Sequence, residues 1–532
     1  MTGARRRDRW AARSALLALS LLGADTAHAG GTLRIGNGPE PETLDPQRAE
    51  GVSAGNILRD LYEGLTAIAA DGRPMPAAAR GWVISADGRT YTFQLRDAAR
   101  WSNGDALTAD DFVAGLRRSV APATGSAFAQ LLRPIRHAVD VLEGRLPPEQ
   151  LGVHALAPRV LQIELEAPAP QLLGLLSHQS TFPIHGPSLR AHGDGFARPG
   201  RLVSNGAYRL QNWIVQSQVD LARNPFYWNA ARTAIDAVRY VATEDIHSEF
   251  KRYRAGELDV TYEIPPAQAQ QIRRDFAGQL HLAPYLGVYF YGLNLTRAPF
   301  RDRPQLRQAL SMVIDREVIA AKVLNGLALP AYGWIPPGTA QHRAQQPDWA
   351  DWPYDRRVER ARELYRAAGY SDTAPLDVEI RYNTHESHRR VATVVAAMWK
   401  QALGVRTRLL NEEFKVFLYK RRLRRDTQVF RAAWMADFND PSSFLGILHS
   451  AHGKNDSGWA DAAYDALLEH AAATADAGAR AELLAQAEAK VLADAPVIPI
   501  YFYVSKHLVH PRVRGWTDNV LDYHYSKDLS LN

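Results

Sequence analysis

Residues 90–120 read TYTFQLRDAARWSNGDALTADDFVAGLRRSV. Apolar and polar side chains alternate over Thr90–Leu95, and this pattern predicts a β-strand. The turn residues Ser102–Asp105 follow, and Thr108 is then placed as the N-cap of a helix that carries Phe112 on its apolar face. Because strand and helix signals stand so close together, we expect a mixed α/β fold.

The alternation typical of strands and the three-to-four-residue spacing typical of helices recur along the chain. We therefore expect an α/β fold over most of its length. No repeat of fixed period is visible, so the chain is not expected to be a solenoid or a propeller. The predicted strands are Thr32–Ile35, Arg159–Leu165, Val219–Ala222 and Leu376–Tyr382, and the predicted helices are Asn56–Leu65, Arg356–Ala368 and Ala479–Leu492.

The first 29 residues have the three parts of a secretory signal peptide. Five arginines precede the apolar run Ala15–Leu22, and Ala27-His28-Ala29 forms a small-x-small cleavage site. The apolar run is much shorter than the roughly 20 residues that span a bilayer. We therefore predict a signal peptide over residues 1–29, cleavage after Ala29, and a mature chain in the periplasm without a membrane anchor.

Composition excludes several classes of protein. The chain contains no cysteine, so neither a lipid-bearing cysteine nor a disulfide can form. The formal net charge is +6, and removal of five arginines and two aspartates with the leader leaves +3. A charge this small does not favour a nucleic-acid partner. About 500 mature residues exceed what one core usually supports, so at least two domains with a cleft between them are expected.

Four short motifs resemble chemical sites, but each lacks the context that the chemistry needs. Gly51–Gly55 matches the nucleophile elbow of hydrolases, yet a polar, turn-rich segment precedes it instead of a buried strand. His385–His388 lacks the spacing of a helical zinc motif, and Gly36–Gly38 lacks the third glycine of a dinucleotide site. The basic run Arg421–Arg425 is typical of a solvated helix face or a contact surface. We therefore expect no catalytic residue, no cofactor and no metal site.

The segment Arg431–Pro441, RAAWMADFNDP, combines a guanidinium, carboxylates and aromatic rings. A partly desolvated carboxylate binds an ammonium group, a guanidinium binds a carboxylate in a fork, and aromatic rings supply apolar walls. This set can recognise a zwitterion. It can equally be an Arg-Asp pair that braces a surface loop. Composition alone leaves both interpretations open.

Motifs of one protein family follow one another along the whole mature chain. They are Glu42–Pro46, Glu50–Val52, Arg59–Leu65, Trp101–Gly104, Thr108–Phe112, Ser204–Tyr208, Arg223–Trp228, Pro330–Gly333, Ala436–Asn439 and Val497–Tyr501. With these motifs the chain resembles the periplasmic oligopeptide-binding proteins of ABC importers, which belong to the peptide/nickel type of bacterial extracellular solute-binding protein family 5.

The resemblance implies an α/β, three-lobed periplasmic binding protein, type II and cluster C-like, with a ligand cleft between two major lobes. Lobe I would comprise residues 30–62, 184–286 and 505–532, the inserted lobe II residues 63–183, and lobe III residues 287–504. The resemblance also implies a monomer that is not an enzyme. Such a protein binds short peptides as an added strand and delivers them to an inner-membrane ABC permease.

Ten residues match positions that contact the ligand in the family. Asp437 matches the aspartate that receives the α-ammonium group of the peptide. Arg431 and His388 match basic residues that meet ligand carboxylates, and Arg421 matches another arginine of the pocket. Three residues match an edge of the cleft: Glu50, Val52 and Arg59. Three more match aromatic walls of the pocket: Phe290, Phe414 and Trp434.

The chain departs from its relatives at three positions. Leu324 stands where they have a lysine that serves longer peptides, and Gly287 and Met435 stand where they have a pocket disulfide. Loss of the lysine favours tripeptides. Two alternative ligand classes stay open, a murein-type cell-wall peptide and a haem or nickel chelate. An anionic anchor such as Asp437 suits an ammonium group better than a chelate.

Overall fold

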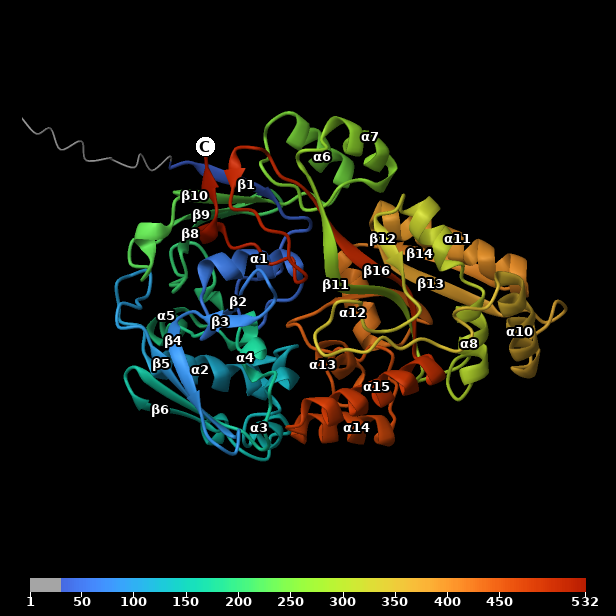
Figure 1. Ribbon diagram of the computed structural model, residues 1–532, viewed down its shortest axis with the longest axis horizontal. Helices are drawn as coiled ribbons and strands as arrows, with labels where there is room; N and C mark the ends of the chain where they lie inside the picture. Colours follow the sequence, from blue (N-terminus) through green and yellow to red (C-terminus); the bar gives the residue numbers. More distant parts are fainter. Residues whose placement is uncertain (1–29) are drawn as a thin grey trace, which may run out of the picture.

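The computed structural model describes residues 30–532, so the signal peptide predicted for residues 1–29 lies outside the described residues. Figure 1 shows two halves side by side, one made mainly of the blue, cyan and green segments and the other of the yellow, orange and red ones. Two long strands, β11 and β16, lie between them. Among residues 30–532, no helix has both the length and the apolar character needed to cross a bilayer.

The strand and helix predicted within residues 90–120 are confirmed. Strand β5 (Thr90–Leu95) alternates buried and half-buried residues, and helix α2 (Ala109–Val120) follows. Thr108 caps α2 in a capping box, in which the Asp111 carboxylate accepts a hydrogen bond from the Thr108 backbone N–H at 2.7 Å. β5 belongs to an antiparallel sheet with the order β4 (Ala79–Ile84), β5, β7 (Val160–Glu164), β6 (Val153–Ala157).

A second four-stranded sheet lies in the same half of the molecule. Its order is β1 (Thr32–Gly36), β10 (Ala237–Val241), β9 (Gln218–Arg223), β8 (Tyr208–Ile214), and β1 pairs with β10 in parallel. The strands predicted at residues 32–35, 159–165 and 219–222 are thereby confirmed. A common hydrophobic core, which includes Leu33, Phe93 and Phe112, packs both sheets and α2 together.

The bounds predicted for the first helix are wrong. Helix α1 (Val52–Leu61) begins four residues before the predicted Asn56 and ends four residues before the predicted Leu65. Tyr62 is already extended, and Gly64 lies so close to the Leu176 carbonyl oxygen that a Cβ there would be 2.7 Å from it. The chain must straighten at this point to enter strand β2 (Thr66–Ile68), so Leu65 is buried outside the helix.

The other half is built on a mixed six-stranded sheet. Its order is β12 (Ala328–Pro330), β16 (Val497–Leu508), β11 (Leu280–Leu293), β15 (Val429–Met435), β13 (Asp377–Asn383), β14 (Arg406–Glu412). Strand β13 confirms the strand predicted at residues 376–382. Helices cover both faces of the sheet, among them α8 (Pro304–Met312), α10 (Tyr354–Ala367), α11 (Glu386–Leu403), α14 (Ala462–Ala473) and α15 (Ala477–Asp494).

The period of a strand explains why both faces of this sheet are buried. Tyr289 and Tyr291 join a core with residues of α8, α10 and α11, whereas Val288 and Phe290 join a second core with residues of α14 and α15. Helices α10 and α15 confirm the helices predicted at residues 356–368 and 479–492.

Strands β11 and β16 connect the two halves. β11 has 14 residues and β16 has 12, and they pair in antiparallel fashion with a register shift between Pro284 and Val288. Leu280 and Leu508, at one end of the pair, pack with helices α6 (Ile246–Arg254) and α7 (Ala269–Asp275). The lobe boundaries predicted after residues 286 and 504 fall inside these strands, and the division into lobes stays a prediction.

Candidate binding site

A cavity of about 370 Å³ lies between the two halves. Its walls come from the start of α1, from β11, β15 and β16, and from the loop around residue 522. All ten residues selected from the sequence line this cavity, although their roles toward a ligand are not tested by that placement. They are Glu50, Val52, Arg59, Phe290, His388, Phe414, Arg421, Arg431, Trp434 and Asp437.

Asp437 is a buried carboxylate with little to balance its charge. Its side chain is 9% exposed, its Oδ1 lies 3.5 Å from His178 Nε2, and its Oδ2 is buried with no hydrogen-bond partner among residues 30–532. Burial raises the pKa of Asp437 to about 7, against the opposing effect of Lys454. Burial also lowers the pKa of His178 to about 3, so His178 is neutral at pH 7. The arrangement leaves one carboxylate oxygen available to a cation.

The backbone around Asp437 is held on both sides. The Asp437 N–H donates to Ser443 Oγ at 2.8 Å, and the Tyr523 hydroxyl donates to the Asp437 carbonyl oxygen at 3.3 Å. The following loop is braced by the buried pair of Arg480 and Asp440, with contacts of 2.7 and 2.9 Å. An Arg-Asp pair therefore does brace this loop, but it uses neither Arg431 nor Asp437.

Arg431 is a half-buried guanidinium without a carboxylate partner in the described structure. Within the described part of the chain, no Asp or Glu oxygen lies within ion-pair distance of it. Its Nη2 donates to the Tyr503 hydroxyl at 3.2 Å, its Nη1 donates to Asn383 Oδ1 at 3.4 Å, and it lies over the Tyr289 ring at 5.1 Å. Aromatic and amide groups thus hold Arg431 in place while its charge stays available.

The two histidines near Arg431 offer neutral imidazoles. His388 is buried near the start of α11, and its ring centroid lies 4.6 Å from that of His385. Burial, Arg431 and His385 together hold the pKa of His388 well below its usual range. His388 Nδ1 is buried without a hydrogen-bond partner in the described structure. His388 can therefore orient a ligand carboxylate by a hydrogen bond, while Arg431 supplies the charge.

Two other charged residues of the site, Arg421 and Glu50, are paired, whereas Arg59 donates to Asn56 Oδ1 and has no carboxylate partner within residues 30–532. Arg421, in helix α12 (Phe414–Leu423), lies 2.6 Å from Asp456, so its charge is compensated. Glu50 forms ion pairs with Arg422, at 2.6 Å, and with Lys454. Burial raises the pKa of Glu50, but these two cations outweigh burial and lower it. The basic run that begins at Arg421 is a contact surface, because Arg422 reaches across to Glu50 in the other half.

Strand β15 has one open edge along the cavity. β13 pairs with β15 only at Val429 and Phe430, whereas β11 pairs with it over Val429–Met435. Residues Arg431–Met435 therefore have a neighbouring strand on one side only, and all five line the cavity. Such an edge can accept an extended chain as a further strand.

Sequence reasoning missed several residues of the site because only the fold brings them there. His178 lies about 260 positions before Asp437 in the chain, and Lys454 lies about 17 positions after it, yet both are close to its carboxylate. Tyr523 stacks under Arg59, whose guanidinium carbon lies 3.9 Å from the ring centroid. None of these residues stands in a motif, and the polar stretch around His178 was the only signal available.

The chain matches the family model described as bacterial extracellular solute-binding proteins, family 5 Middle, over residues 73–456. The chain belongs to this family. It is 37% identical to the periplasmic oligopeptide-binding protein OppA of Escherichia coli, over 94% of this chain and 92% of that protein. It is 38% identical to the probable deoxycholate-binding periplasmic protein YgiS of E. coli, over 94% and 93%.

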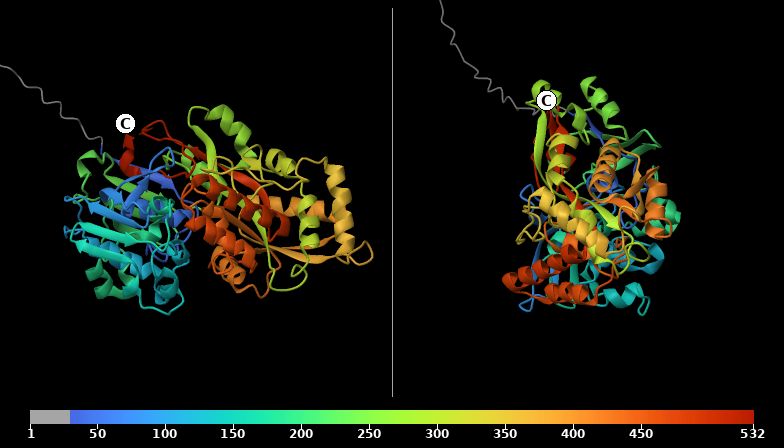
Figure 2. Two further views of the ribbon diagram at one scale, coloured as in Figure 1. Left: turned by 60° about the horizontal axis from the view of Figure 1, so that its bottom comes forward. Right: turned by 90° about the vertical axis from the view of Figure 1, so that its right-hand side faces the viewer.

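A third relative allows the arrangement of the two halves to be compared. The structure of the E. coli murein tripeptide-binding protein MppA has 34% identity and a TM-score of 0.91, over 94% of this chain and 99% of that chain. Its unliganded open form has a TM-score of only 0.70, over 94% and 98%. The halves of this protein are therefore arranged differently from that open form. Contacts such as His247 Nε2 to Glu386 Oε2, at 2.6 Å, join them. Figure 2 shows the blue and cyan half beside the orange and yellow half from two further sides.

Proposed function

We propose that this protein is a periplasmic solute-binding protein that captures short peptides and delivers them to an inner-membrane ABC permease. The observation that carries the proposal is the open edge of β15, Arg431–Met435, which is followed two residues later by the unpaired carboxylate of Asp437. An extended peptide can pair its backbone with that edge and place its ammonium group at Asp437. Family membership and the similarity to an oligopeptide-binding protein support the same function.

The proposal includes the division into lobes. Lobe I, residues 30–62, 184–286 and 505–532, would hold the sheet that contains β1. Lobe II, residues 63–183, would hold the sheet that contains β5, and lobe III, residues 287–504, would hold most of the six-stranded sheet. The mature chain, cleaved after Ala29 and carrying no lipid, would act as a monomer without catalysing a reaction.

Two other ligand classes are outcomes of the test. A murein-type peptide fits the same anchors and differs in its chemistry beyond the first residues. A deoxycholate molecule or a metal chelate offers no ammonium group to Asp437, and an anionic ligand would face a buried carboxylate. The cavity chemistry therefore favours peptides with a free N-terminus over deoxycholate and over a metal chelate.

Calorimetric titration with the alanine series from di- to penta-alanine tests the proposed function. We expect tri-alanine to bind tightest, because Arg431 has no carboxylate partner within the described residues and Leu324 offers a longer ligand no charge. N-acetyl-tri-alanine is the matched control and should bind at least a hundredfold more weakly. Equal affinity for the free and acetylated peptides, or binding of deoxycholate alone, contradicts the proposal.

The affinity for peptide should also depend on pH. Because Asp437 has a pKa of about 7, it carries a proton below that pH, and the ligand ammonium must displace it. The affinity should fall about tenfold for each pH unit below 7. Above about pH 8 the peptide loses its own ammonium charge, so binding should be tightest between these values. Titrations from pH 5 to pH 9 measure this, and a flat profile below pH 7 contradicts it.

A further inference from the structure

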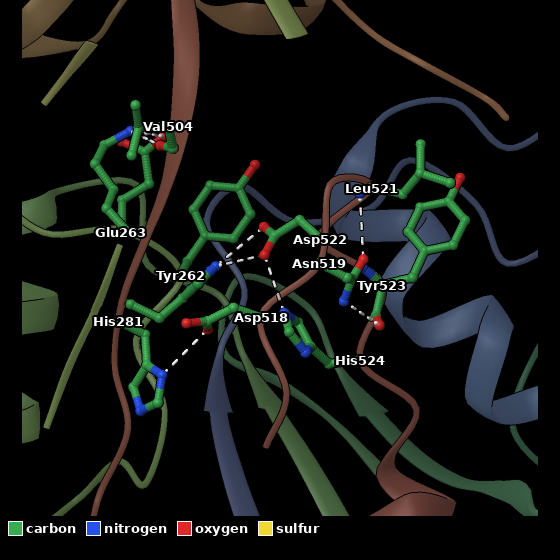
Figure 3. A network of polar contacts seen from close by, with 12 residues as sticks. Tyr262, Glu263, His281, Val504, Asp518, Asn519, Leu521, Asp522, Tyr523 and His524 are labelled. Atoms are coloured by element: carbon green, nitrogen blue, oxygen red, sulfur yellow. Dashed lines mark hydrogen bonds and ion pairs between the residues drawn. The ribbon is translucent and has the colours of Figure 1, made fainter. Parts of the chain in front are cut away.

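A cluster of two histidines and one aspartate lies beside the cavity. His507 is in β16, and Asp522 and His524 are in the loop that follows strand β17 (Val513–Arg514). Asp522 Oδ1 lies 3.0 Å from His507 Nε2 and 3.0 Å from His524 Nε2, and Figure 3 shows Asp522 pointing toward His524. In the part of the chain that the structure describes, this is the one group of three or more such side chains with converging donor atoms.

Surrounding groups fix the direction in which these donors point. His507 Nδ1 lies 2.7 Å from the Thr261 carbonyl oxygen, so Nδ1 carries the proton and Nε2 faces the cluster. The His524 ring stacks on Trp516 with 3.6 Å between ring centroids and 17° between planes. A hydrogen bond from one imidazole nitrogen to a backbone carbonyl, with the other nitrogen free to ligate, is the usual support of a metal-binding histidine.

The spacing of the three donors suits a small divalent ion. Their ligand atoms all lie within 4.8 Å of one another. Ligands held about 2.0–2.2 Å from a tetrahedral zinc ion are about 3.3–3.6 Å apart, so the two 3.0 Å contacts would have to widen by only a few tenths of an ångström. The nearest cation of the same strand, Lys506, is paired with Glu263 at 3.5 Å.

We propose that His507, Asp522 and His524 bind a divalent transition metal ion of the class that prefers imidazole, with Zn²⁺ as the probe. Two imidazoles and a carboxylate provide three ligands, and water completes the coordination. The ion would replace the protons now shared between the rings and the carboxylate. It would tie the loop around residue 522 to β16, one of the two strands that connect the halves.

The site would not be recognised from the sequence. His507 stands 15 positions before Asp522, and no motif joins them. The sequence-based expectation of no metal site rested on the spacing within His385–His388, which is a different pair of histidines. An ion bound to Asp522 would also hold the neighbouring Tyr523 in place at the cavity, where Tyr523 contacts both Arg59 and the Asp437 carbonyl oxygen.

The experiment is a titration of chelator-stripped, full-length mature protein with Zn²⁺ by calorimetry and with Co²⁺ by visible absorption. We expect one ion per chain and a rise in melting temperature with metal. His524→Phe keeps the ring on Trp516 but removes the ligand nitrogens, and Asp522→Asn keeps the shape but removes the charge. Each variant should bind the ion at least tenfold more weakly.

His281→Asn is the matched control. His281 contacts the same Trp516 and pairs with Asp518 at 3.1 Å, but it lies outside the three-donor group, so its loss should leave metal affinity unchanged. The proposal is overturned if the wild type binds neither ion at millimolar concentration. It is also overturned if His524→Phe binds the ion as tightly as the wild type. If Asp522→Asn does not fold, the affinity of His524→Phe alone tests the proposal.

Discussion

Asp437→Asn lowers the affinity for a peptide with a free N-terminus by at least a hundredfold, which corresponds to about 2.7 kcal/mol. The amide keeps the shape of the side chain but removes the charge that meets the ammonium group. Breaking one member of a buried ion pair typically costs about 3–5 kcal/mol. His178 cannot take over the role, because an imidazole supplies no negative charge to an ammonium group. Calorimetry with tri-alanine on both proteins measures the loss.

The same substitution should stabilise the protein without ligand. The pKa of Asp437 is raised from 3.8 in the unfolded chain to about 7, so the folded state holds the proton more tightly. The free energy of unfolding therefore falls as the pH rises from 3.8 to about 7, by on the order of 4 kcal/mol at 1.36 kcal/mol per pKa unit. The amide of the Asp437→Asn variant has no charge to bury, so its free energy of unfolding does not fall in this way. The variant should therefore be more stable than the wild type above about pH 7.

Asp440→Asn is the control for this pair of effects. The Asp440 carboxylate is paired with Arg480 at 2.7 Å, so its removal leaves a buried guanidinium alone and should lower the melting temperature. Thermal unfolding at pH 8 should rank Asp437→Asn above the wild type and Asp440→Asn below it. An Asp437→Asn protein that binds tri-alanine as the wild type does would disprove the role of Asp437 as the anchor.

Arg431→Gln should cost between tenfold and a hundredfold in affinity for tri-alanine, whereas Arg421→Gln should cost about threefold or less. Hydrogen bonds to a charged group contribute about 1.5–3 kcal/mol, and within residues 30–532 Arg431 has no carboxylate partner. Arg421 already pairs with Asp456 at 2.6 Å. Both residues are arginines that line the cavity, so the comparison isolates the availability of the charge.

Tri-alanine amide completes the test as a double-mutant cycle. The amide lacks the terminal carboxylate, so the wild type should bind it more weakly than the acid, while Arg431→Gln should bind the two alike. A larger loss for Arg421→Gln than for Arg431→Gln would contradict the assignment. A difference between acid and amide that survives in Arg431→Gln would place the carboxylate elsewhere in the cavity.

Local patterns predicted much of the fold. Strand β5 and helix α2 were predicted because alternation, a turn and an N-cap are all contained within about 30 residues of sequence. The C-terminal end of α1 was not, because it depends on the close approach of Gly64 to Leu176, which is more than a hundred positions away. The crossing of β11 and β16 between the halves has no local signal either.

The candidate site shows the same division. Arg431–Pro441 was recognisable as unusual from its composition, but only the resemblance to a family assigned Asp437 and Arg431 separate roles. Tertiary structure decided which arginine braces the loop, because Arg480 reaches Asp440 from a helix about 40 positions away. His178, Lys454 and the three-donor cluster around Asp522 consist of single polar residues whose meaning depends on their neighbours in space.

The assembly of the half that contains strand β1 affects the order of folding. Asp259 holds both Arg34 and Arg512, and the Arg512 guanidinium donates to the Thr32 carbonyl oxygen across 480 positions of sequence. Asp60 likewise accepts a hydrogen bond from the Ser526 N–H at 3.0 Å. Contacts of such long range form slowly, since the loop between them must close first. This half therefore cannot be completed until residues 512–526 have been synthesised, and a chain exported by the signal peptide predicted for residues 1–29 would benefit from that delay.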